Sequence, residues 1–236
     1  ETAAGLLNSI GLMNPGFDGW CEDVLPLLAE AGTTVVINIA GETFEEYFEL
    51  AARLDDLPGI HAVEVNISCP NVADGGACPA QDPQKTEMVI SGVVERTRLP
   101  VIAKLSPNVA DVTVIARAAQ AAGADSVSLV NTFLGTAVKW REQRPVFKNV
   151  VAGLSGPAIK PMALWLVKRV AEAVSIPVIG IGGIMNAEDV MEFLLVGATA
   201  VQVGTANFVN PTAAADVVRD LPGLLAEVGA ESVMDY

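Results

Sequence analysis

The chain has 236 residues, of which 51% are hydrophobic, so it is long and apolar enough to bury a sizeable core. Its formal net charge of -14 and pI near 4.4 disfavour nucleic acids and anionic membrane surfaces as partners, since both bind to basic faces. No apolar stretch reaches about 18 residues without a charge, Pro or Gly, so no membrane span is expected.

Cysteine and histidine usage indicates the compartment. The three cysteines include no CxxC pair, and a single histidine is too few for a typical zinc site. The first residues do not have the pattern of a signal peptide. We therefore expect a reduced, cytoplasmic protein without a metal site.

Short β-branched runs alternate with amphipathic segments along the chain. The predicted strands are 33–41, 61–68, 100–106, 125–131, 177–183 and 199–205. The predicted helices are 44–54, 85–97, 109–123, 161–174 and 187–197. This alternation is typical of parallel βα units, and no linker interrupts it. We predict a single domain over residues 1–236.

The number of units favours a barrel that is incomplete at its N-terminus. A (β/α)8 TIM barrel has eight strands and typically about 250 residues, whereas only six units are visible here. We expect the N-terminal one or two βα units to be missing, and the exposed sheet edges to make such a fragment poorly soluble. The alternative is an open doubly wound sheet, but its usual phosphate loop at the first strand is absent from the sequence.

Polar residues and glycines mark the carboxyl ends of the predicted strands, where barrels carry their chemistry. In chain order these are Asn38, Asn66 with Cys69, Lys104, Asn131 with Thr132, Gly182 with Gly183, and Gly204 with Thr205. A barrel with a purely structural role would not require them. We therefore expect one site at this end of the sheet.

Lys104 and the glycines suggest an anionic ligand. Lys104 ends the apolar run "PVIA", and a buried ammonium is costly unless it faces an anion; the alternative is a lysine that extends to the rim. Glycines after the last two strands let backbone N–H groups approach a phosphate, although ordinary tight turns also use such glycines. Asn186 is predicted to cap the helix that follows.

Cys69 is a candidate for proton transfer. Most single cysteines are inert and buried, but this one lies in the polar stretch "NISCPNVADGG" (66–76) at a strand end. No histidine is close in sequence, since His61 lies at the opposite end of its strand and is expected at the surface. We expect Cys21 and Cys78 to be structural. The segment 137–149 predicts a hairpin over the site or, equally, a surface decoration.

Several motifs together resemble the class 1 dihydroorotate dehydrogenases, the soluble flavin barrels of pyrimidine synthesis. They are "NSIGLMNPG", "VEVNISCPNV", "AKLSPNV", "LVNT", "GLSGPAIKP", "IGIGGI" and "AVQVGTANF", and they cover essentially the whole chain. Cys69 stands where class 2 enzymes carry Ser. The motif "LSGPAIKP" is most similar to subclass 1B, whose catalytic chain binds FMN and joins a subunit with FAD and a 2Fe-2S cluster in a heterotetramer.

The resemblance implies a reaction and roles for individual residues. Dihydroorotate would lose a C5 proton to Cys69 and a C6 hydride to FMN, and electrons would pass through the partner subunit to NAD. The substrate would contact Asn8, Ser9, Ile10, Gly11, Leu12, Asn66, Asn71, Asn131 and Thr132. The flavin would contact Asn38, Asn66, Lys104, Val130, Gly156, Gly182, Gly183, Gly204 and Thr205, with the last four at its phosphate.

Three alternatives stay open on the sequence alone. They are the fumarate-dependent subclass 1A, a related reductase barrel acting on uracil or thymine, and a non-catalytic barrel that binds a phosphate ligand. Two departures from the family also matter. The family's first strands, with an additional lysine, are absent, and Cys78-Pro79 occupies a stretch that is usually small or aromatic.

Overall fold

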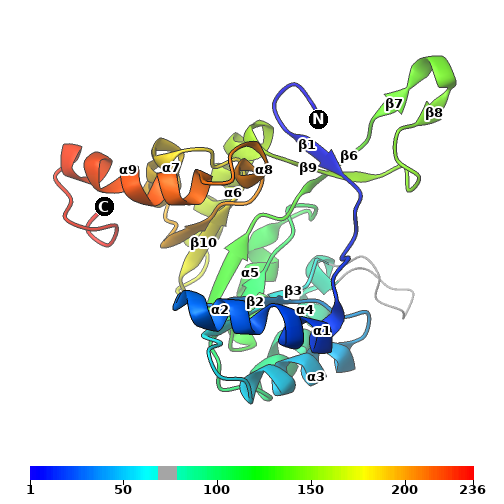
Figure 1. The fold of residues 1–236 in the computed structure, drawn as a ribbon, viewed down its shortest axis with the longest axis vertical. Coiled ribbons are helices and arrows are strands. Elements are labelled where there is room, and N and C mark those ends of the chain that lie inside the picture. The colour runs from blue at the N-terminus through cyan, green and yellow to red at the C-terminus, as the bar shows by residue number, and fades with distance from the viewer. Residues whose placement is uncertain (69–78) are drawn as a thin grey trace.

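A six-stranded sheet forms the centre of the molecule (Figure 1). The structure is a computed structural model, and it describes residues 1–68 and 79–236. Each strand of the sheet lies within a run that the sequence predicted as a strand, and is shorter than that run. The strands are β2 (Val36–Ile39), β3 (Ala62–Asn66), β4 (Val101–Lys104), β5 (Ser126–Leu129), β10 (Val178–Ile181) and β11 (Ala200–Gln202).

Helices follow these strands along the chain and pack beside one another on the outside of the sheet, α3 with α4, α4 with α5, α5 with α6, and α6 with α7. The helices that alternate with the strands are α3 (Phe44–Asp55), α4 (Pro83–Val94), α5 (Val112–Ala121), α6 (Lys160–Ala171) and α7 (Ala187–Leu195). The remaining ones are α1 (Gly16–Asp23), α2 (Leu25–Ala31), α8 (Ala206–Val209) and α9 (Ala213–Glu227), with 3-10 turns η1 (Pro79–Gln81), η2 (Trp140–Glu142) and η3 (Pro157–Ile159).

The strand order distinguishes the two predicted folds. The sheet runs β2-β3-β4-β5-β10-β11, and every neighbouring pair is parallel. The order never reverses, whereas a doubly wound sheet has a switch point at which it does. The units therefore follow one another as they do in a (β/α)8 barrel.

One hydrogen bond shows that the sheet is strongly curled. The Nε2 of Gln202 on β11 donates to Oε1 of Glu64 on β3 at 2.7 Å. In a flat sheet these strands, four positions apart, would be roughly 19 Å from each other. The two side chains meet because the sheet closes around its interior, so the prediction of a barrel-type α/β fold is confirmed.

Local sequence signals explain where several helices begin. Thr43, Asp82 and Asp111 precede α3, α4 and α5, and their side chains accept hydrogen bonds from first-turn backbone N–H groups. Asn186 caps α7 as predicted and forms a capping box with Asp189. These helix starts follow the carboxyl ends of the strands, where the site is expected.

A second, antiparallel sheet covers part of the carboxyl end. It consists of β1 (Leu6–Asn8), β9 (Ala152–Ser155) and β6 (Phe133–Gly135), in the order β1-β9-β6. The predicted hairpin exists as β7 (Val138–Lys139) and β8 (Arg144–Pro145). Of its two expected positions, the surface decoration is the one observed, because Figure 1 shows the hairpin projecting away from the six-stranded sheet. The strands β6 and β9 lie nearer to the site.

The first strand of the sheet is partly exposed. On β2, Val36 is 44% exposed, and neither α1 nor α2 contains a buried residue. The predicted poor solubility of this chain on its own stays a prediction. None of the helices in residues 1–68 and 79–236 has both the length and the apolar character that a bilayer crossing requires.

Candidate active site

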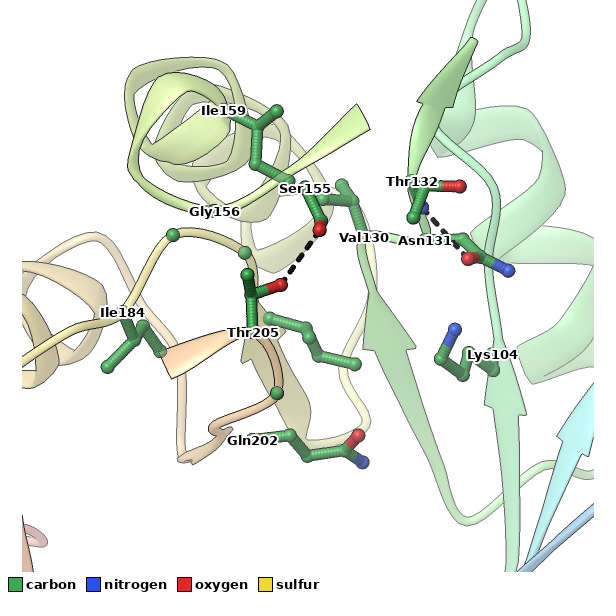
Figure 2. Close-up of a pocket in the computed structure, with 14 residues that line it drawn as sticks. Lys104, Val130, Asn131, Thr132, Ser155, Gly156, Ile159, Ile184, Gln202 and Thr205 are labelled. Carbon is green, nitrogen blue, oxygen red and sulfur yellow. Dashed lines mark hydrogen bonds between the residues drawn. The ribbon is translucent and has the colours of Figure 1, made fainter. Parts of the chain in front are cut away.

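A pocket opens at the carboxyl ends of β4, β5, β10 and β11 (Figure 2). Its cavity of about 160 Å³ is smaller than the roughly 300–1,000 Å³ of a complete small-molecule site, so it can enclose only part of a nucleotide-sized ligand. The residues that line it are Lys104, Val130, Asn131, Thr132, Ser155, Gly156, Ile159, Ile181, Gly182, Gly183, Ile184, Gln202, Gly204 and Thr205.

The pocket contains a single lysine among its lining residues. Lys104 is the last residue of β4, it is half-buried, and Figure 2 shows its amino group on the same side of the pocket as Asn131. Burial lowers the pKa of Lys104 below its ordinary value, while the nearby Glu64 carboxylate acts in the opposite direction. A poorly solvated cation at the wall of a cavity is suited to binding an anionic group.

Glu64 of β3 is a buried carboxylate near this lysine, and it does not itself line the pocket. The side chain is 5% exposed and accepts three hydrogen bonds, from Asn38 Nδ2 at 2.6 Å, Ser128 Oγ at 2.7 Å and Gln202 Nε2 at 2.7 Å. Its donors lie on β2, β5 and β11, so the carboxylate joins four strands through the interior of the sheet. Gln202 also lines the pocket, which places this network directly beneath it.

The opposite wall is made of small residues. Gly182 and Gly183 follow β10 with φ values of 130° and 78°, a region that other residues rarely adopt. A Cβ on Gly183 would lie 2.7 Å from Lys160 Cβ, whereas a Cβ on Gly204 would meet no atom within 4 Å. Thr205 donates a hydrogen bond from Oγ1 to Ser155 Oγ at 2.8 Å, as Figure 2 shows. Glycines and other small residues in such a wall let a phosphate approach the backbone N–H groups.

The residues predicted to contact a flavin fall into two groups. Seven of the nine line the pocket: Lys104, Val130, Gly156, Gly182, Gly183, Gly204 and Thr205. The other two are Asn38, which donates to Glu64, and Asn66, which pairs with Lys104 in the β3–β4 register and is 8% exposed. Neither of these asparagines lines the cavity.

The residues predicted to contact the substrate are more scattered. Asn131 and Thr132 line the pocket, and the Thr132 backbone N–H donates to Asn131 Oδ1 at 2.8 Å. Asn8 lies on β1 opposite Gly153 of β9, and the next predicted residues, Ser9, Ile10, Gly11 and Leu12, are exposed and do not line the cavity. Cys69 and Asn71, like Cys78, lie outside the described residues.

Sequence reasoning missed several polar residues at this site, namely Glu64, Ser128, Ser155 and Gln202. A signal was present for two of them. Glu64 and Gln202 interrupt otherwise apolar strand runs, "HAVEV" and "TAVQV", and a polar residue inside a buried strand requires a partner. The partner itself could not be read from the sequence, because these two residues are 138 positions apart.

Comparison with known proteins agrees with this geometry. A family profile described as dihydroorotate dehydrogenase matches residues 1–225. Relatives from Geobacter sp. (strain M21) and Desulforudis audaxviator (strain MP104C) are each 53% identical over 233 residues, which is 99% of this chain and 76% of theirs. A relative from Bacillus pumilus (strain SAFR-032) is 48% identical over 233 residues, 99% of this chain and 75% of its own.

All three relatives carry the name dihydroorotate dehydrogenase B (NAD(+)), catalytic subunit. The resemblance to class 1B catalytic subunits that the motifs indicated is thereby confirmed over nearly the whole chain. The chain belongs to the dihydroorotate dehydrogenase family.

Proposed function

We propose that this protein is the FMN-containing catalytic subunit of a class 1B dihydroorotate dehydrogenase, which oxidises dihydroorotate to orotate in pyrimidine biosynthesis. The supporting observation is the pocket at the strand ends, where Lys104 and Asn131 face a wall of glycines in a chain of this family. Residues 1–236 contribute a flavin-binding domain of the barrel type.

The residues of the pocket fit FMN. Gly182, Gly183, Gly204 and Thr205 would hold its phosphate, since the empty space beside Gly204 leaves room against the backbone. Lys104 would lie at the N1–O2 edge of the ring and offset negative charge there. Val130 and Gly156 would contact the cofactor, and Asn38 and Asn66 would border the ring. Bound FMN would supply the hydride acceptor.

The substrate would lie beside this pocket, near the carboxyl end of β3. Asn66, Asn71, Asn131 and Thr132 would hold the dihydroorotate ring, and residues 8–12 would close over it. Cys69 would act as the base that accepts the C5 proton of dihydroorotate. A thiol can accept this proton when part of it is present as thiolate.

The electron acceptor follows from the relatives' names. Those names contain NAD(+) and the words catalytic subunit, which imply a second subunit in the relatives' complexes. For this chain we propose the same arrangement: a partner with FAD and a 2Fe-2S cluster, assembled as a heterotetramer in the cytoplasm, that passes electrons to NAD. The names favour this arrangement over the fumarate-dependent subclass 1A.

An anaerobic visible spectrum tests the proposal. The protein with FMN bound should lose its flavin absorption when dihydroorotate is added, and Cys69→Ala should slow this loss by at least about a hundredfold, as removal of a general base does. Bleaching by dihydrouracil instead of dihydroorotate would favour the related reductases. Bound FMN that no dihydropyrimidine bleaches would overturn the proposal in favour of a non-catalytic barrel.

A further inference from the structure

Glu64 is a buried carboxylate held in place by three neutral donors. The amides of Asn38 and Gln202 and the hydroxyl of Ser128 all lie within 2.7 Å of its oxygens. None of these donors carries a charge of its own that could neutralise the carboxylate. The network therefore holds the carboxylate in place without compensating its charge.

Lys104 is the charged residue nearest to Glu64 in the register of the paired strands. Asn66 pairs with Lys104, and Glu64 lies two residues earlier on the same face of β3, so Glu64 and Lys104 are diagonal neighbours. Lys104 also pairs with Ser128, whose hydroxyl donates to Glu64. The carboxylate and the ammonium thus share an inward-facing corner of the sheet.

Opposing effects act on Lys104 in this corner. Burial lowers its pKa, and the Glu64 carboxylate raises it. Without the carboxylate, burial alone would favour the neutral amine, which could not offset charge on a ligand. Glu64 is connected to the pocket in a second way, because its donor Gln202 is also a lining residue.

We propose that Glu64 is a positioning residue that keeps Lys104 protonated at the flavin site and thereby sets the upper pH limit for stabilising negative charge on the cofactor. This inference rests on the proposed function for its consequence, but the state of Lys104 can be measured in the protein without FMN. Glu64 touches no reacting atom in this scheme. It acts through the lysine and through the network that holds both groups.

The direct test is an NMR titration of the Lys104 side-chain nitrogen in FMN-free protein, with the signal assigned by its loss in Lys104→Met. In the parent protein Lys104 should be protonated at pH 7. In Glu64→Gln its titration midpoint should fall by about one pH unit or more, as expected when a close opposite charge is removed. The matched control Glu87→Gln removes an exposed carboxylate on α4 and should leave the midpoint unchanged.

An exchange variant tests the role of charge separately from packing. The side chains of Glu64 and Gln202 are joined by a hydrogen bond of 2.7 Å. Combining Glu64→Gln with Gln202→Glu exchanges these two side chains and so restores a carboxylate close to its original position. This double variant should recover much of the lost shift in the Lys104 midpoint. A Lys104 midpoint that is equal in the parent and in Glu64→Gln would overturn the proposal. If Glu64→Gln does not fold, the parent titration decides: a Lys104 that is neutral at pH 7 refutes the role, and a protonated one supports it.

A second readout separates this inference from the proposed function. With FMN bound, a plot of the flavin midpoint potential against pH should change slope at a lower pH in Glu64→Gln than in the parent. This change should match the fall in the titration midpoint of Lys104. A shifted lysine in a protein that dihydroorotate does not bleach would refute the proposed function and leave the role of Glu64 intact. Bleaching together with an unshifted lysine would refute only the role of Glu64.

Discussion

Replacing Gly204 by Ala separates ligand binding from folding at the proposed phosphate site. A Cβ added at Gly204 would meet no atom within 4 Å, and Gly204 does not have a positive φ. The free energy of unfolding should therefore change by less than about 1 kcal/mol. If a phosphate lies against this backbone, the methyl group occupies its place.

The expected loss of FMN affinity can be estimated from the backbone hydrogen bond to the phosphate that Gly204→Ala would remove. A hydrogen bond to a charged group contributes about 1.5–3 kcal/mol, so loss of one backbone contact to the phosphate should raise the Kd for FMN by roughly 10- to 150-fold. Quenching of FMN fluorescence measures this Kd, and urea unfolding of the FMN-free protein measures stability.

Gly223→Ala is the matched control for this experiment. Gly223 lies in α9, away from the pocket, and a Cβ there also meets nothing within 4 Å. This helical substitution should stabilise the protein by about 0.5–1 kcal/mol and leave FMN affinity unchanged. A Gly204→Ala variant that binds FMN as tightly as the parent would refute our placement of the phosphate.

Three further predictions concern residues in the site or next to it. Gly183→Ala should lower the free energy of unfolding by about 2–4 kcal/mol in urea titrations, because φ is 78° and the new Cβ would lie 2.7 Å from Lys160 Cβ; a loss below about 1 kcal/mol would contradict this. Asp189→Asn should lower the free energy of unfolding by about 2 kcal/mol, since Asp189 accepts a hydrogen bond from Lys160 at 2.6 Å and completes the capping box of α7; unchanged stability would argue against this pairing. Partial burial lowers the pKa of Lys160, but its bonds to two carboxylates raise this pKa overall. The stability that Lys160 gains from these bonds is therefore fully present below pH 10.5, and it is lost only as the pH rises through the raised pKa. Lys104→Met should stabilise the FMN-free protein at pH 7, and this gain in stability should shrink toward pH 10.5. The reason is that folding lowers the pKa of Lys104, so the unfolded chain keeps the lysine proton to higher pH than the folded protein does. Equal gains in thermal unfolding at pH 7 and pH 10 would contradict this pH dependence.

Much of the fold was predictable because its signals are local. The β-branched runs and amphipathic segments mark strands and helices, and Asn186 was recognised as a cap from its place before α7. The site was partly predictable for a similar reason. In a parallel sheet all carboxyl ends lie at one edge, so Lys104, Asn131 and Gly204 could be expected together without any knowledge of the distances between them.

The tertiary structure decided the contacts that depend on curvature. The bond between Gln202 and Glu64 exists only because the sheet curls until β11 and β3 face each other, and no local pattern encodes that closure. The direction of the β7–β8 hairpin likewise depends on the antiparallel pairing of β6 with β9, the two strands between which it lies in the chain. The sequence by itself therefore determined which groups stand at the ends of the strands. Only the closed geometry brought a buried carboxylate beneath the lysine that one of those strands presents.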